Sequence, residues 1–250
     1  MKKITVLLAA AISVCLSLSA SAQTSSTFLV PNPKTAKWSY VETDAKGQVV
    51  ATQYHSVDAL EGDGINGSLK LLVEEITKSP ADTLKNFIFY RFKDGEYTAD
   101  MNAMFEGDIL ETFVDSAIKE EGEEISQEQM KAAMEAIRAE LKISGEVRGI
   151  PRYPKVGNLP DFEFQIKFSI LNMKVIGENR RILGTEKITT NAGTFDCFIL
   201  EETLTTKAMM MKEVEKVKSW YAYGIGLVKE ITYDKNGKLI STIVLNSINW

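Results

Sequence analysis

Residues 162–175 read FEFQIKFSILNMKV, and this stretch decides the fold. Apolar residues stand at every second position from Phe162 to Ile170, and polar residues stand between them. This alternation is typical of a strand with one buried and one solvated face. After Ile170 the apolar set moves by one position, beginning at Leu171. We interpret this slip as a β-bulge or sharp bend between Ile170 and Leu171, of the kind that lets long strands curl into barrels.

Strand-like segments continue on both sides of this stretch. Two of the connecting turns have the sequence D-x-x-G, at Asp44 to Gly47 and at Asp234 to Gly237, and glycine suits the positive φ that such a turn needs. The further expected strands are 38–44, 49–57, 67–76, 86–92, 97–101, 181–190, 194–206, 213–223, 226–233 and 239–249. We therefore predict a mainly β fold, with an antiparallel curved sheet that forms a β-roll or open barrel.

One region has a helical period instead. Apolar residues fall at helical spacing from Ile109 to Ile118, and a second stripe of this kind runs from Met130 to Leu141. Ser126 stands three residues before Gln129, which is the spacing of a capping box at a helix N-terminus. We predict an inserted αα-hairpin over about residues 107–142. The glutamates at its joint lack the spacing of a calcium loop, and we interpret them as a solvated turn.

The N-terminal residues predict export. Lys2 and Lys3 precede an apolar run that ends at Leu18, and Ala20-Ser21-Ala22 supplies the small residues of a signal-peptidase site. The run is shorter than the roughly 20 residues of a membrane span, and we predict no transmembrane span in the mature chain. We expect a signal peptide at 1–22, a flexible leader at 23–35 and a single β-rich domain at 36–250. The predicted location is periplasmic or secreted.

Charge and cysteine content restrict the possible partners. The full chain has a net charge of −5 at pH 7, and removal of the signal peptide makes the mature chain more acidic. Nucleic-acid binding is disfavoured because it requires a basic surface, and attraction to anionic lipid headgroups is disfavoured for the same reason. Cys15 lies in the signal, so Cys197 alone remains and no internal disulfide can form.

Several motifs together resemble a known family. They are TTNAGTFDCF at 189–198, WYAYGIGLVK at 220–229, YDKNGKL at 233–239, Tyr153 to Asp161 and the opening segment 38–47. This set resembles the TapB-like family of secreted bacterial proteins, although the helical hairpin is longer than the family pattern. The family is one of unknown function. The resemblance implies an exported, mostly antiparallel β-roll or barrel, and it carries over no catalytic residue.

The residues offer little catalytic chemistry. His55 is the only histidine, and it lies in phase with the apolar face of its strand, which favours a structural role. Cys197 shares a strand face with Phe195 and Ile199 and lacks the basic surroundings of a reactive thiolate. We predict no catalytic residue, no metal site and no cofactor.

The run Met209, Met210 and Met211 is the candidate ligand or partner surface. At the tip of a hairpin these flexible apolar side chains would lie beside the mouth of a lipid-binding cavity or on a partner surface. The alternative is that they cover the open end of the core.

Three functions follow, in order of preference. The first is an exported non-catalytic protein that binds an amphipathic or apolar ligand, such as a lipid, between the sheet and the helical hairpin. The second is a protein-interaction or envelope-structural component without a small ligand, with an envelope protein as its partner. The third is a hydrolase that uses a pair of carboxylates.

Overall fold

The computed structural model describes residues 36–62, 66–78, 81–94, 96–106, 126–151, 153–168, 171–208 and 211–249. The predicted signal peptide and leader lie outside the described residues. The first helix of the predicted αα-hairpin, the joint after it, and Met209 and Met210 lie outside them too.

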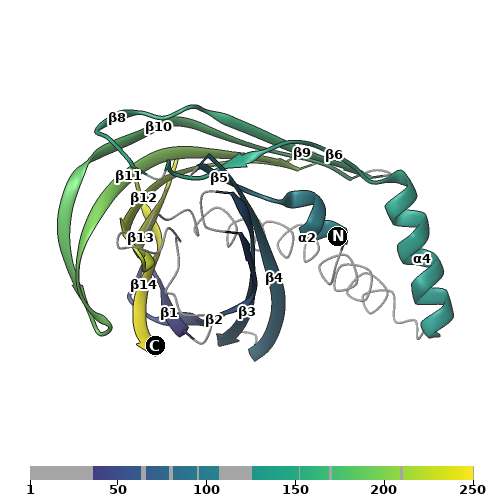
Figure 1. The fold of residues 1–250 in the computed structure, drawn as a ribbon, viewed down its shortest axis with the longest axis horizontal. Coiled ribbons are helices and arrows are strands. Elements are labelled where there is room, and N and C mark those ends of the chain that lie inside the picture. The colour runs from purple at the N-terminus through teal and green to yellow at the C-terminus, as the bar shows by residue number, and fades with distance from the viewer. Residues whose placement is uncertain are drawn as a thin grey trace.

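The described strands form one 14-stranded sheet, and every pairing is antiparallel. The strands are β1 (Lys37–Asp44), β2 (Val49–Gly62), β3 (Gly67–Lys78), β4 (Ala81–Lys93), β5 (Glu96–Ala99), β6 (Lys142–Gly145), β7 (Val147–Arg148), β8 (Gly157–Asn158), β9 (Phe162–Phe168), β10 (Leu171–Thr190), β11 (Gly193–Ala208), β12 (Met211–Ala222), β13 (Gly226–Asp234) and β14 (Leu239–Asn249). Their spatial order is β6-β9-β10-β11-β12-β13-β14-β1-β2-β3-β4-β5-β7, and β8 pairs with β10. The β14–β1 pairing joins the last strand to the first within this sheet, and the sheet curves into a nearly closed barrel (Figure 1). The predicted fold class is confirmed.

The two edge strands of the sheet are consecutive in the chain, and this closes the gap between them. Only Glu146 separates β6 from β7, and its N–H donates to the carbonyl of Glu163 at 3.0 Å. Gly145 has a φ of +80°, and a Cβ there would lie 2.0 Å from the Glu163 carbonyl oxygen. Glycine therefore permits the close approach that joins the two edges.

The opening sequence stretch forms a hairpin, which corrects the predicted bulge. Phe168 of β9 pairs with Leu171 of β10, so the chain reverses between them. In this register the even-numbered residues of β9 face the odd-numbered residues of β10. The apolar set therefore changes parity although both strands keep the same face in the core. A two-residue reversal produces the same sequence signature as a bulge.

The two D-x-x-G turns are equivalent in the structure. Asp44 accepts hydrogen bonds from the backbone N–H groups of Lys46 and Gln48 at 2.8 and 2.9 Å. The carboxylate of Asp234 accepts from the two N–H groups at the same offsets, also at 2.8 and 2.9 Å. The shared turn chemistry therefore accounts for the similarity of the two segments.

Two short helices are described, α2 (Met101–Glu106) and α4 (Gln127–Glu140). Helix α4 begins with the predicted capping box, because Ser126 and Gln129 each accept from the other's backbone N–H. Helix α2 corrects the strand predicted at 97–101. The strand ends at Ala99, and Asp100 then accepts from the N–H of Ala103 through its carboxylate. An aspartate in this position caps a helix.

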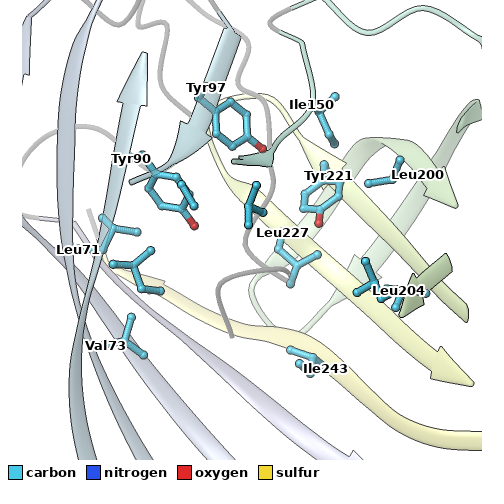
Figure 2. Close-up of a cluster of buried hydrophobic side chains, with 14 of the residues drawn as sticks. Leu71, Val73, Tyr90, Tyr97, Ile150, Leu200, Leu204, Tyr221, Leu227 and Ile243 are labelled. Carbon is cyan, nitrogen blue, oxygen red and sulfur yellow. The ribbon is translucent and has the colours of Figure 1, made fainter. Parts of the chain in front are cut away.

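Large side chains fill the barrel interior. Figure 2 shows residues from strands far apart in the sequence converging there. The labelled residues are Leu71, Val73, Tyr90, Tyr97, Ile150, Leu200, Leu204, Tyr221, Leu227 and Ile243. They belong to one buried cluster that also includes Met104, Phe164 and Ile166. Burial of this apolar surface is the main stabilising contribution to the barrel.

Strand β10 bends strongly and carries the β10–β11 hairpin outside the barrel wall (Figure 1). Its register against β11 shifts between Glu178 and Arg181 and again between Ile182 and Gly184. Two irregularities so close together allow a sharp change of strand direction. The bent hairpin is held near the other strands where Glu186 accepts a hydrogen bond from the Trp220 indole at 2.7 Å.

Candidate functional site

A polar cleft of about 890 Å³ is the candidate site. It lies beside the irregular part of β10, and β11, β12, the end of β13 and the segment around β8 complete it. Its lining residues are Asn158, Leu159, Asp161, Asn179, Arg180, Arg181, Glu201, Glu202, Thr203, Lys216, Val217, Lys218, Tyr233 and Gly237. This volume lies within the range of small-molecule sites, although most such sites are more apolar.

Strand register places the solvent-facing side chains of the cleft in two rows. Arg181 lies opposite Glu201, which in turn lies opposite Lys218. In the second row, Lys216 lies between Thr203 and Tyr233. Directly paired residues share a face of the sheet. The two lysines of β12 therefore stand side by side on the wall of the cleft.

A fully buried ion pair lies at the base of the cleft. Arg180 donates from Nε to Glu202 Oε2 at 2.8 Å, and both side chains are almost completely inaccessible to solvent. The guanidinium also lies over the Phe162 ring, 4.9 Å from its centroid. Burial raises the pKa of the Glu202 carboxyl, and the neighbouring Arg180 charge opposes this shift. Among the described residues, Arg180 is the only lysine or arginine that is buried.

Arg180 also fixes the segment that leads from the edge strand β7 to β9. Its Nη1 donates to the Pro160 carbonyl at 2.9 Å, and its Nη2 donates to the carbonyls of Arg148 and Gly149 at 2.8 and 3.1 Å. This segment also presents the most exposed large apolar side chains of the described chain, Tyr153 and Val156, at 65% and 72% exposure. A buried cation therefore positions an exposed apolar loop at the rim of the cleft.

Carboxylates gather on the inner face of the same strands. Glu230 is buried and accepts a hydrogen bond from the Ser219 hydroxyl at 2.9 Å. Burial raises its pKa to about 8, and the charges of Glu202, Glu42 and Glu215 add to the shift. Glu230 is therefore mainly protonated at neutral pH, which avoids the cost of an isolated buried charge.

Three other carboxyls on the inner face also have raised pKa values. Burial, together with the nearby charge of Glu213, raises the pKa of Glu215 to about 7. The pKa of Glu42 is raised by burial and by the Glu75 charge, and burial raises the pKa of Glu75 itself. The inner face thus carries several carboxyls whose pKa values are raised, mainly by burial.

The two residues considered for catalysis lie in the core, away from the cleft. His55 packs against Trp38 and Tyr40, and burial lowers its pKa to about 3. Its Nε2 lies 3.2 Å from Gln53 Oε1, and its Nδ1 has no hydrogen-bond partner among the described residues. Cys197 is buried, and its pKa is raised to about 12 by burial and by the charges of Asp196 and Glu186.

Met211, the described member of the candidate run, lies at the far end of the β11–β12 hairpin. Met211 pairs with Ala208 at the start of β12, and it is exposed. Met209 and Met210, between these paired residues, lie outside the described part of the chain. Met211 is thus close to the tip of this hairpin, and none of the described residues that line the cleft is a methionine.

Sequence reasoning missed the cleft because its residues come from six separate segments. The available signal was the alternation Glu215-Lys216-Val217-Lys218-Ser219, in which one parity is basic. A second signal was the consecutive pair Arg180 and Arg181, since neighbours in a strand point to opposite faces and one of the two must point inward.

The described residues include no group of three or more His, Cys, Asp or Glu side chains that could hold a metal ion. Among the helices that the structure describes, none is both long and apolar enough to cross a membrane.

A family model described as DUF3108-like matches residues 34–245. The chain therefore belongs to the DUF3108-like family. No curated protein matches the sequence. The narrower resemblance to TapB-like proteins stays a prediction.

Two solved structures share the fold. One is described as a lipoprotein from Parabacteroides distasonis, with a TM-score of 0.62, 21% sequence identity and coverage of 91% of this chain and 100% of that one. The other is described as an exported protein with a YmcC-like fold from Bacteroides fragilis, with a TM-score of 0.61, 17% identity and coverage of 89% and 99%. At these identities the likeness shows the fold alone.

Proposed function

We propose that this DUF3108-like protein is an exported, non-catalytic binding protein that holds a small amphipathic ligand in the outer cleft. The observation that carries the proposal is the cleft itself, which has a volume of about 890 Å³ and is lined mainly by polar side chains. The predicted signal sequence supports export, as do the names of the two structural neighbours, one described as exported and one as a lipoprotein.

The cleft is a better ligand site than the space between the sheet and the helices. On the helix side of the barrel, Met101 and Met104 of α2 and Phe164 of β9 are buried in the core. Side chains therefore fill the space between α2 and the sheet, whereas residues 107–125 of the predicted hairpin lie outside the described part of the chain. In the cleft, Asn158 and Lys216 are exposed and available to a ligand, and Tyr233 offers an aromatic surface.

The environments of the reactive groups favour binding over catalysis. A general base needs a pKa near the working pH, and burial takes His55 far below it. A nucleophilic cysteine needs a lowered pKa, whereas that of Cys197 is raised. Within the cleft, Glu201 and Glu202 each form an ion pair with an arginine. Asp161 is the third carboxylate that lines the cleft, and a hydrolytic pair formed with it would require Glu201 or Glu202 to leave its arginine.

Mass spectrometry of the mature protein, purified gently from its native envelope, tests the proposal. We expect a stoichiometric small molecule that is released by organic extraction. The variant Thr203→Trp fills the cleft and should lose it. Thr194→Trp, on the exposed part of the same strand and outside the cleft, should retain it. An empty wild-type protein, or equal loading of both variants, would contradict the proposal.

A protein-interaction role is the second candidate, and the exposed loop at Tyr153 and Val156 favours it. Exposed apolar side chains on a fixed loop are typical of interaction surfaces. Crosslinking in the native envelope should then capture one stable partner, and Tyr153→Ser combined with Val156→Ser should abolish the capture. The same paired change should not affect the ligand content of the cleft.

A further inference from the structure

We infer that the cleft selects ligands with an acidic group, a carboxylate or a phosphate, and that Lys216 and Lys218 bind this group. The inference rests on the proposed function, because it names the ligand class of the same site. The arguments come from how the charges around the cleft are paired and from what the wall beside the lysines can contact.

The cationic side chains of the cleft differ in whether they are already neutralised. Arg180 is fully engaged by Glu202 and three carbonyl oxygens. Arg181 donates from both Nε and Nη2 to Glu201. No ion pair within the described residues neutralises Lys216 or Lys218. These two ammonium groups are therefore the cations left for a ligand.

The position of the two lysines suits a single anionic group. They stand two residues apart on β12, so both project from the same face. Lys218 also lies over the Trp220 ring, 4.9 Å from its centroid, which limits the directions in which its ammonium can point. Hydrogen bonds from two ammonium groups to one carboxylate or phosphate are charge-assisted and stronger than neutral ones.

The rest of the wall suits the body of an amphipathic molecule. Tyr233 lies directly across from Lys216 on β13, and Leu159 lies across the cleft on the segment after β8. An acidic headgroup at the lysines would leave an apolar portion in reach of these side chains.

Titration followed by ¹H–¹⁵N NMR of the mature protein tests the inference with matched probes. The probes are octyl phosphate and octanoate, which carry an acidic group, and 1-octanol, which does not. Vesicles of phosphatidylglycerol and of phosphatidylcholine form a second arm, which separates a free acidic amphiphile from the headgroups of a bilayer. We expect octyl phosphate or octanoate to shift the amide signals of Asn158, Thr203 and Tyr233, with weaker binding at higher salt.

Charge variants then assign the contact. Lys216→Glu and Lys218→Glu should each weaken binding of the acidic probe by about tenfold or more. Lys212→Glu changes an exposed lysine on the same strand that does not line the cleft, so its affinity should stay within about twofold of wild type. Retained folding of each variant is checked from the same NMR spectra.

The outcomes separate this inference from the proposed function. Equal cleft shifts from 1-octanol and octyl phosphate would overturn the acidic-group inference but leave a binding cleft in place. Loss of affinity in Lys212→Glu as large as in Lys216→Glu would overturn it as well, since the effect would then be general attraction. Absence of cleft shifts with every probe would also overturn it. The proposed function is judged independently by the native extraction.

Discussion

Two arginine–glutamate pairs, one residue apart in both strands, show how strongly the face of a strand determines the role of a charge. Arg180 pairs with Glu202 inside the protein, where the side chains are 1% and 2% exposed. Arg181 pairs with Glu201 on the cleft side, where they are 54% and 38% exposed. The two pairs contain the same chemical groups and differ in how far their side chains are exposed to solvent. The inner pair organises structure, whereas the outer pair contributes charge to a surface.

The same division extends across the neighbouring strands. Glu215 and Ser219 point inward on β12. Lys216 and Lys218, which lie between them in the sequence, point outward. On β13, the carboxyl-bearing residue Glu230 points inward. The inner face therefore collects carboxyl groups with raised pKa values, and the outer face collects lysines. The two-residue period of the sheet thus places these buried carboxyls on one face and Lys216 and Lys218 on the other.

The largest effect should come from breaking the inner pair. Arg180→Met leaves Glu202 buried without a cation and removes donors from three carbonyl oxygens. We expect a loss of about 3–5 kcal/mol in the free energy of unfolding. Arg181→Met is the matched change in the exposed pair and should cost about 0–1 kcal/mol. Urea denaturation of both variants measures the difference.

A double variant sharpens this test. In Arg180→Met with Glu202→Leu neither partner of the inner pair is left as an unpaired charge, so much of the lost stability should return. The remaining deficit reports the hydrogen bonds from Arg180 to the segment between β7 and β9. Equal stability of Arg180→Met and Arg181→Met would contradict the distinction between the two faces.

The next effect concerns pH. The pKa of Glu230 is raised in the folded protein to about 8, from an ordinary value of 4.5. The folded state therefore holds its proton more tightly than the unfolded state does. The contribution of this group is fully present below pH 4.5 and is lost as the pH rises toward 8. The free energy of unfolding should fall through this window, by at most about 1.4 kcal/mol per pH unit for one group.

Glu230→Gln tests this assignment because the amide keeps the shape of the protonated acid but cannot ionise. Its free energy of unfolding should depend less on pH between 5 and 8 than that of the wild type. Urea denaturation at a series of pH values provides the comparison. A variant with an unchanged pH dependence would show that Glu230 is not the dominant inner carboxyl.

The sequence predicts the barrel well because its signals are local. Alternation from Phe162 onward, the turn chemistry at Asp44 and Asp234, and the capping box at Ser126 each depend on residues within a few positions. Where Phe168 pairs with Leu171 in a hairpin, the sequence predicts a bulge or sharp bend, because each of these changes the parity of the apolar positions. Only the pairing of the two strands distinguishes them.

The candidate site could not be predicted because it depends on bends and on strand order. The shift of register in β10 brings Arg180 under the segment that contains Pro160, and nothing local in the sequence fixes this bend. The raised pKa of Glu230 likewise comes mainly from burial in the barrel, and the charge of Glu42, nearly two hundred residues away in the chain, adds to it. Contacts of this kind exist only once the barrel closes.

The smallest effect should come from the outer lysines, and it completes the comparison. Lys216→Gln and Lys218→Gln remove charges that face solvent, so the free energy of unfolding should change by no more than about 0.5 kcal/mol.

Glu215→Gln alters the adjacent inward position, where burial raises the pKa to about 7. It should increase stability above pH 7, because the wild-type carboxyl must ionise there against its surroundings. Urea denaturation at pH 6 and pH 8 separates the cases. If Lys216→Gln and Glu215→Gln responded alike to pH, the two faces of β12 would not be electrostatically distinct. If the free energy of unfolding changed with pH in Glu215→Gln but not in Lys216→Gln, the two faces of β12 would differ electrostatically.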